Sequence, residues 1–182
     1  MPAAPEDLFA RLDALDIPHR THQHRPVFTV DESRDLKASM PGGHTKNLFL
    51  KDKKGRLFLL SAIADTVIDL NAVSKLLGVG RFSFGNAELL MRHLGVTPGS
   101  VTVFALINDA ERNVRLILDE ALFAHDPVNF HPLRNDATTA IGAADLLQFV
   151  RATGHEPIRL TFDAAGAPSL IEPGRPPAHL EP

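Results

Sequence analysis

Two apolar runs flank a short polar turn in the sequence KNLFLKDKKGRLFLLSA, residues 46–62. Residues 46–51 and 56–62 are rich in Leu and Phe, which favours strands, and residues 52–55 have the composition of a tight turn. Gly55 can adopt the left-handed backbone conformation that such a turn requires. The stretch therefore predicts a β-hairpin with two antiparallel strands.

Helices and further strands are predicted on both sides of this hairpin. Apolar spacing and capping residues predict helices over residues 5–15, about 30–39, 69–78, 86–95 and 143–151. Short apolar runs predict strands over residues 101–107, 114–118, 128–130, 138–141 and 158–162. Because no regular strand–helix–strand rhythm is present, the expected fold class is α+β: a compact single domain with a mixed, largely antiparallel sheet flanked by helices.

The domain is expected to span residues 1–165, followed by a Pro-rich tail over residues 166–182. The composition of that tail is typical of an extended or disordered segment. No basic patch followed by an apolar run begins the chain, and no apolar run is long enough to span a bilayer, so neither secretion nor a membrane partner is expected.

The charge balance limits the partners that the protein can have. Of the 182 residues, 19 are Lys or Arg and 22 are Asp or Glu, which gives a net charge of −3. Such a chain does not coat a polyanion, so any nucleic-acid contact must be local, and no DNA partner is expected. The lack of cysteine excludes disulfides, thiolate nucleophiles and Cys-ligated metals, and it favours the cytoplasm.

Several common catalytic motifs fail in this sequence. There is no Gly-x-Ser-x-Gly elbow and no phosphate-binding loop, and the segment that starts Gly78-Val79-Gly80 follows a predicted helix instead of a strand. His22 and His24 would share one face of a strand and could bind a metal. No third ligand stands at a matching spacing, however, so hydrogen-bonded or surface histidines are expected, with no metal and no cofactor.

Lys46 is the first candidate for chemistry. Strand alternation places Lys46 on the same face as Leu48 and Leu50, so its ammonium either lies at the mouth of a core-facing cavity or extends into solvent at the strand end. Asn47 adds an amide, and the backbone N–H groups of residues 41–45 could receive an anion. Together these groups suit an anionic or carbonyl-bearing ligand.

A run of cations surrounds the predicted turn. Between residues 44 and 56, a single acid, Asp52, stands among five cations: Lys46, Lys51, Lys53, Lys54 and Arg56. Such a run is either a solvated hairpin tip or a patch that holds a phosphate backbone beside a pocket. The spacing alone leaves both interpretations open.

Two further polar segments could line a pocket. His131 precedes Asn135, Thr138 and Thr139, and these side chains either line a site for a small polar substrate or have structural roles only. In the second segment, residues 95–102, Gly99 and its neighbours let backbone N–H groups approach a ligand, although a plain turn would need the same residues.

Taken in order, these segments resemble the YbaK/prolyl-tRNA-synthetase-associated domain family, and most closely its free-standing ProX branch. The matching pieces are residues 24–30, 45–52, 99–102, 106–109 and 130–133, together with Thr138 and Thr139. The resemblance as a whole extends over about residues 8–163, nearly the whole chain. The resemblance implies a compact α+β domain that hydrolyses mischarged aminoacyl-tRNA in trans, and the ProX branch removes alanine from proline tRNA.

The resemblance also implies roles for individual residues. Lys46 would be the essential catalytic residue, and the aminoacyl end would be held by Asn47, Gly99, Ser100, His131 and Thr138. The tRNA acceptor end would contact Lys51 and Arg81, with Lys53 and Lys54 beside them on the hairpin. The expected partners are the acceptor end of proline tRNA and, in addition, prolyl-tRNA synthetase.

One position departs from the family pattern. Relatives commonly have Pro where this chain has Val103. If residues 101–107 form a strand, the Val103 N–H joins the sheet, and Pro at this position would cost a hydrogen bond.

Two other classes of function stay open at this stage. One is a non-catalytic tRNA-binding or regulatory module. The other is a small-molecule hydrolase that acts on free aminoacyl esters. Within the editing class, the amino-acid range could also extend to cysteine and serine.

Overall fold

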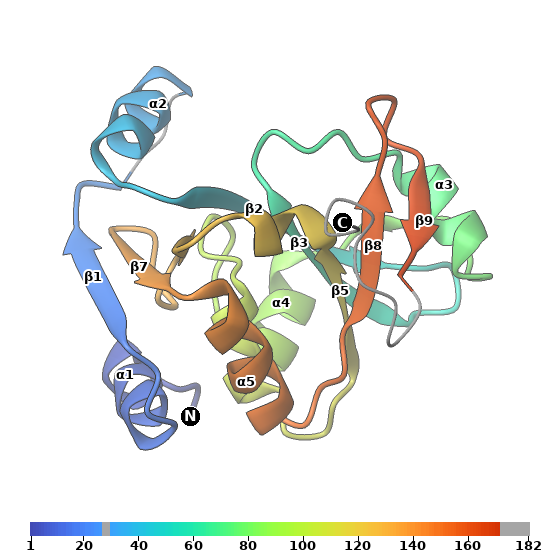
Figure 1. Ribbon diagram of the computed structural model, residues 1–182. Coiled ribbons are helices and arrows are strands. Elements are labelled where there is room, and N and C mark those ends of the chain that lie inside the picture. Colours follow the sequence, from blue (N-terminus) through green and yellow to red (C-terminus); the bar gives the residue numbers. More distant parts are fainter. Residues whose placement is uncertain (27–29, 172–182) are drawn as a thin grey trace.

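A mixed β-sheet runs through the centre of the computed structural model, which describes residues 1–26 and 30–171 (Figure 1). The strand order is β1-β7-β6-β2-β3-β5-β8-β9, and β4 pairs with β2 off this path. The strands are β1 His19–Gln23, β2 Gly43–Lys51, β3 Leu57–Ile63, β4 Ser83–Phe84, β5 Val114–Asp119, β6 Val128–Phe130, β7 Ala137–Ile141, β8 Ile158–Phe162 and β9 Pro168–Leu170. The helices are α1 Pro5–Ala14, α2 Val30–Ser39, α3 Leu70–Leu76, α4 Ala87–Leu94 and α5 Ala143–Ala152, with 3₁₀ helices η1 Val103–Asn108 and η2 Glu120–Ala124.

The predicted hairpin is confirmed. Strands β2 and β3 pair antiparallel from Thr45 opposite Ile63 to Lys51 opposite Leu57, and Gly55 in the turn has a φ of +80°. The pairs β1–β7, β6–β7, β2–β4 and β8–β9 are also antiparallel, whereas β2–β6, β3–β5 and β5–β8 are parallel. The expected α+β class with a mixed, largely antiparallel sheet is therefore confirmed.

Two apolar cores lie on opposite faces of the sheet. Phe49, Leu59 and Leu116 project into the larger core, which α1, α4, η1 and α5 cover. The alternate residues Leu50 and Phe58 project into the smaller core, which α3 covers. Helix α2 stands apart, near the edge strand β1 (Figure 1). The face of β1, β7 and β6 near α2 is consequently less covered by apolar packing.

The expected strand over residues 101–107 is wrong, because residues 103–108 form the 3₁₀ helix η1. The Thr102 side chain accepts a hydrogen bond from the Phe104 N–H (3.3 Å) and caps that helix. Val103, Phe104 and Ala105 are all fully buried. A run that is buried on every side has no polar face, so its periodicity cannot distinguish a strand from a helix.

The sheet also extends beyond the expected domain boundary at residue 165. Residues 168–170 form β9, which pairs antiparallel with β8 and is anchored by Leu170 opposite Leu160. Strand β1 is also absent from the prediction, since its sequence His-Arg-Thr-His-Gln has almost no apolar residue. The rest of the expected tail, residues 172–182, lies outside the described residues. The spacing of Thr29 and Glu32 predicts a capping box at the start of α2, and Thr29 also lies outside the described residues. Within residues 1–26 and 30–171, no helix is long and apolar enough to cross a membrane.

The geometry around Val103 reverses the expectation that Pro at this position would cost a hydrogen bond. Val103 is the first residue of η1, and the first N–H of a helix has no intrahelical partner. Thr102 has φ −156° and ψ 150°, which is the extended conformation that a residue before Pro favours. We expect Val103→Pro to change the free energy of unfolding by less than about 1 kcal/mol. Urea denaturation measures this, and a loss of 2 kcal/mol or more would contradict it.

Candidate active site

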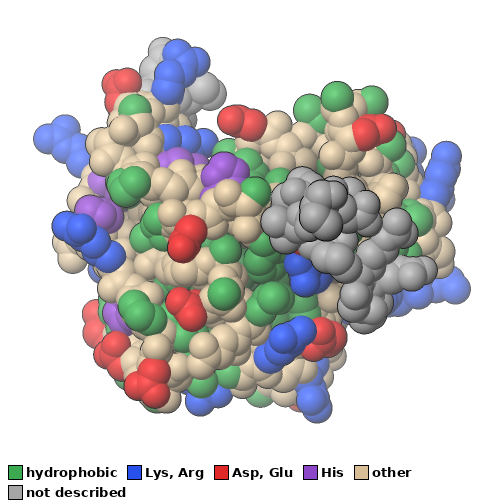
Figure 2. Space-filling model, in the orientation of Figure 1, with side chains coloured by type: hydrophobic (Ala, Val, Ile, Leu, Met, Phe, Trp, Pro, Cys, Tyr) green, Lys and Arg blue, Asp and Glu red, His purple; other side chains and the backbone are tan. Residues whose placement is uncertain are grey.

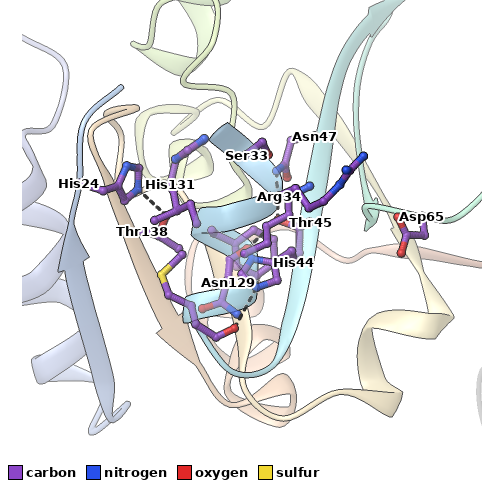
Figure 3. A pocket seen from close by; sticks show the side chains of 14 residues that line it. His24, Ser33, Arg34, His44, Thr45, Asn47, Asp65, Asn129, His131 and Thr138 are labelled. Carbon is purple, nitrogen blue, oxygen red and sulfur yellow. Dashed lines mark hydrogen bonds between the residues drawn. The ribbon is translucent and has the colours of Figure 1, made fainter. Parts of the chain in front are cut away.

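A cavity of about 780 Å³ opens where β2 and β6 separate. The two strands pair only at Gly43 opposite Val128 and His44 opposite Asn129, so the sheet is split beyond this point. A cavity of this volume is in the range that binds small-molecule ligands. Its lining residues come from α2, β2, β6, β7 and the loops between them (Figure 3): His24, Ser33, Arg34, Leu36, Lys37, Met40, His44, Thr45, Asn47, Asp65, Asn129, Phe130, His131 and Thr138.

His131 presents a neutral imidazole to this cavity. Its Nδ1 lies 3.0 Å from the Ala137 carbonyl oxygen, which can only accept, so Nδ1 carries the proton and Nε2 is left as an acceptor. Burial lowers the pKa of His131 more than this hydrogen bond raises it, and the nearby His24 lowers it further. The neutral ring can therefore accept a hydrogen bond or a proton at Nε2 near pH 7.

Thr138 and His24 form a second polar pair in the cavity wall. The Thr138 hydroxyl lies 2.8 Å from His24 Nε2, and His24 Nδ1 lies 2.8 Å from the Arg25 carbonyl oxygen. Because the carbonyl only accepts, His24 Nδ1 donates to it, which leaves Nε2 to pair with the Thr138 hydroxyl. Both histidine nitrogens are thus engaged, and the Thr138 oxygen keeps acceptor capacity for a ligand (Figure 3).

Asn47 brings an unsatisfied acceptor to the cavity. Its Oδ1 is buried and has no hydrogen-bond partner among the described residues, whereas Nδ2 lies 3.5 Å from the Thr45 hydroxyl. Thr45 in turn donates to the Asn129 carbonyl (2.7 Å) and fixes this part of the wall. A buried carbonyl oxygen without a donor is costly, so a ligand that supplies an ammonium, N–H or O–H group would gain from filling it.

Lys46 lies beside the cavity and not in its wall. Its side chain shares a strand face with Leu48 and Leu50, as expected, but its ammonium donates to the Thr66 carbonyl. The Thr66 hydroxyl donates to the buried Asp119 (2.6 Å), which anchors the turn that holds this carbonyl. Strand alternation left open whether this ammonium lies at the mouth of a cavity or in solvent, and in the structure it lies against the backbone at Thr66. The ammonium is thus held at Thr66, and the residue before Thr66, Asp65, lines the cavity.

Helix α2 supplies the cations of the cavity wall. Arg34 and Lys37 both line it, and the sequence interpretation missed them because it assigned α2 no functional role. It also missed His24, His44 and Asn129 as wall residues. One feature of the sequence pointed to α2: this helix directly precedes the strand that carries Asn47, so the side chains of α2 could reach the cavity beside Asn47.

Gly99 and Ser100 do not reach the cavity wall. Gly99 has a φ of +89°, and an added Cβ there would lie 3.7 Å from Asn135 Nδ2. Ser100 is buried, and its N–H donates to the Thr97 carbonyl (3.0 Å). The Gly99 loop thus lies beside Asn135, in the loop that follows His131. The Gly43 N–H, expected to be open to an anion, donates to the Pro127 carbonyl (2.9 Å).

Asp52 organises the basic hairpin tip. It is 3% exposed, and it accepts hydrogen bonds from the side chain and N–H of Arg56 and from the N–H groups of Lys54 and Gly80. Burial alone would raise its pKa, but these hydrogen bonds lower it to about 2. Asp52 therefore stays ionised and ties the segment before Arg81 to the tip.

The cluster at the tip, comprising Lys51, Lys53, Lys54 and Arg81, is separated from the cavity. At about 3.3 Å per strand residue, Lys51 at the end of β2 lies roughly 13 Å along the strand from Asn47, and Lys53 and Lys54 lie farther on, in the turn. The expected site residues therefore fall into two separate groups, one in the cavity and one at the hairpin tip. Asn47, His131 and Thr138 meet in the cavity, and the four cations meet at the tip.

The histidines of β1 form no metal centre. His22 and His24 lie two residues apart, and His24 is engaged by Thr138 and Arg25. Within the residues that the structure describes, no group of three or more His, Cys, Asp or Glu side chains could hold a metal ion.

The amino-acid sequence of the chain is similar to a known protein family and to several named proteins. Residues 24–149 match the family model of the aminoacyl-tRNA editing domain. A Danio rerio protein named prolyl-tRNA synthetase associated domain-containing protein 1 is 40% identical over 166 residues, which cover 88% of this chain and 90% of the relative. The prolyl-tRNA editing protein ProX of Acetoanaerobium sticklandii is 33% identical over 153 residues, which cover 84% and 93% of the two chains.

A solved structure supports the fold. The crystal structure of a protein described as a candidate trans-editing enzyme for prolyl tRNA synthetase has a TM-score of 0.64 and is 18% identical. The match covers 85% of this chain and 94% of that one. The class defined by fold and sequence is thus an editing domain, and the chain belongs to the aminoacyl-tRNA editing domain family.

Proposed function

We propose that the protein is a trans-editing deacylase that hydrolyses the ester of alanine mischarged onto proline tRNA. The observation that carries the proposal is the cavity at the split between β2 and β6, whose wall contains Asn47, His131 and Thr138. The names of the relatives, a prolyl-tRNA editing protein among them, support proline tRNA as the substrate and prolyl-tRNA synthetase as an associated protein.

The unsatisfied Asn47 oxygen suits the α-ammonium of an aminoacyl group. An ammonium is a strong donor, and its hydrogen bond to a buried carbonyl oxygen would remove the cost of leaving that oxygen unpaired. The volume of about 780 Å³ exceeds what an alanyl group fills, which leaves room for the terminal adenosine. The cations Arg34 and Lys37 in the same wall suit the negative charge of the tRNA backbone in general.

The proposed reaction is the attack of water on the ester carbonyl. The bond between the carbonyl carbon and the ribose oxygen breaks, which releases free alanine and an intact 3′-terminal hydroxyl. His131 Nε2 would accept the hydrogen bond of the attacking water or of the free ribose hydroxyl. Lys46, held at the Thr66 carbonyl, would supply positive charge next to the rim for the developing oxyanion. No metal or cysteine takes part in this scheme.

Selectivity for alanine would come from size. Proline carries a ring in place of the alanine methyl group, so a close wall at the aminoacyl end would reject the larger residue. Such a wall does not exclude other small residues, and serine and cysteine esters are therefore the competing substrates to test.

The proposal is tested against its two rivals by comparing three ligands. We expect turnover of alanyl-tRNA of the proline type in the presence of EDTA, and at least 100-fold lower kcat/KM for alanine methyl ester. Comparable turnover of the free ester would favour a small-molecule hydrolase. Binding of uncharged proline tRNA without turnover of any aminoacyl-tRNA would favour a non-catalytic module.

The basic tip gives a separate prediction about RNA binding. Replacing Lys51, Lys53 and Lys54 together by Ala should raise the KM for alanyl-tRNA and leave single-turnover hydrolysis at saturation near normal, because the tip is far from the cavity. Each lost phosphate contact should reduce the slope of log K against log salt by about 0.7–0.9. An unchanged slope would assign these lysines to a solvated tip.

A further inference from the structure

A second hollow of about 540 Å³ adjoins the cavity, between β1, β7 and the segment that joins α2 to β2. We call it the flanking groove. It is lined by Pro18, His19, Arg20, His22, Ser39, Met40, Pro41, Pro127, Asn129, Ala140, Ile141 and Gly142. Met40 and Asn129 line the cavity as well, so the two hollows are neighbours with a shared wall.

One face of β1 leads from the cavity into the flanking groove. His24, His22 and Arg20 alternate on this face, with about 7 Å between successive side chains. His24 belongs to the cavity and the other two to the groove. Figure 2 shows Lys, Arg and His side chains gathered over the surface near β1 and α2.

The groove offers donors that the protein itself does not use. Arg20 is exposed and His22 is partly buried, and neither side chain makes a hydrogen bond or ion pair within residues 1–26 and 30–171. Arg20 presents a fork of N–H groups that matches a phosphate. The same hollow has flat apolar walls, formed by Pro41, Met40 and Ile141. The groove therefore suits a ligand that has both an anionic group and a flat ring, and a nucleotide has both.

The far end limits the groove to one such unit. Beyond Arg20 the lining reaches Gly142, next to the carboxylates of Asp126 and Asp145. Their negative charge disfavours a second phosphate there. A chain that enters from the cavity therefore meets one cationic position and then an acidic one.

We propose that the flanking groove binds the nucleotide immediately 5′ of the terminal adenosine of the tRNA, with the phosphate that links the two nucleotides at Arg20 and His22 and the base against the Pro41 wall. This inference rests on the proposed function, because it assumes that the aminoacyl adenosine occupies the cavity. It gives the protein a means to distinguish an RNA 3′ end from a free aminoacyl nucleoside.

The test compares two esters that differ by one nucleotide: alanyl-adenosine, and the alanyl ester of the dinucleotide cytidylyl-adenosine. We expect Arg20→Ala to lower the ratio of kcat/KM for the dinucleotide to that for the nucleoside by about tenfold, mainly through KM. Arg20→Lys should restore part of this ratio. Lys75→Ala, which removes an exposed cation of α3 from the other side of the sheet, should leave it unchanged. An equal loss for both esters, or no loss, would overturn the proposal.

A binding measurement separates this inference from the proposed function. Calorimetry with uncharged cytidylyl-adenosine, adenosine and cytidine monophosphate needs no turnover. Tighter binding of the dinucleotide than of either single unit, lost in Arg20→Ala, would support the groove even if no ester were hydrolysed. Dinucleotide binding no tighter than that of adenosine would overturn it. Binding of cytidine monophosphate as tight as that of the dinucleotide would assign the groove to a free nucleotide and would also overturn it.

Discussion

Lys46→Ala should lower the turnover of alanyl-tRNA of the proline type by about 10²–10³-fold, because removing one preorganised charged donor typically costs that much. The ammonium is held at the Thr66 carbonyl, and Asp119 anchors the turn through the Thr66 hydroxyl. A charge fixed in this way loses little free energy in reorganising when the oxyanion forms. The loss should appear in kcat, since Lys46 does not line the cavity that binds the substrate.

Two further variants make the Lys46 result interpretable. Lys75→Ala removes an exposed cation of α3 and should keep wild-type turnover. Thr66→Val removes the hydroxyl that fixes the turn and should lower kcat by a smaller factor, with recovery in Thr66→Ser. The melting temperature of Lys46→Ala should stay close to that of the wild type. Wild-type turnover in Lys46→Ala would remove the lysine from the mechanism.

His131→Gln should reduce turnover by about 10²-fold, because a positioned acid–base group typically contributes at least this much. Burial lowers the pKa of His131 below 6.5, so the wild-type ring stays neutral at pH 7 and loses Nε2 as an acceptor only when the pH falls through that lowered pKa. Wild-type kcat should therefore be flat near neutral pH and fall on the acid side, with a midpoint below 6.5.

The pH profile of the variant supplies the control for this prediction. In His131→Gln the acidic limb should be lost, because the group that titrates is gone. A variant that kept both the wild-type rate and the wild-type acidic limb would show that another group, such as His24, sets the profile.

The parts of the fold that sequence reasoning could predict are those with a contrast between apolar and polar positions. The amphipathic helices have that contrast along each helix, the hairpin has it between its apolar strands and the polar turn at Asp52, and both appear as expected. Strand β1 lacks it, because Arg20 and His22 lie on a face that apolar packing leaves open. The run that begins at Val103 also lacks a contrast between apolar and polar positions, because its residues 103–106 are all apolar and buried.

The site could be predicted only in part, because the cavity is a tertiary feature. Asn47 lies far from His131 and Thr138 in the sequence and meets them only because β2 pairs with β6, and β6 with β7. Alternation on β2 placed Lys46 on the correct strand face, but it could not show that the turn at Thr66 would capture the ammonium. Arg34 was missed since no local pattern marks α2 as part of a wall.

The central claim is that this cavity removes alanine, and not proline, from proline tRNA. Its most direct test is to prepare alanyl- and prolyl-esters of the same proline tRNA, with the amino acid labelled, and to follow the release of each under single-turnover conditions with the wild-type protein. We expect rapid release of alanine and no release of proline above the uncatalysed rate. Equal release of the two amino acids, or release of neither, would contradict it.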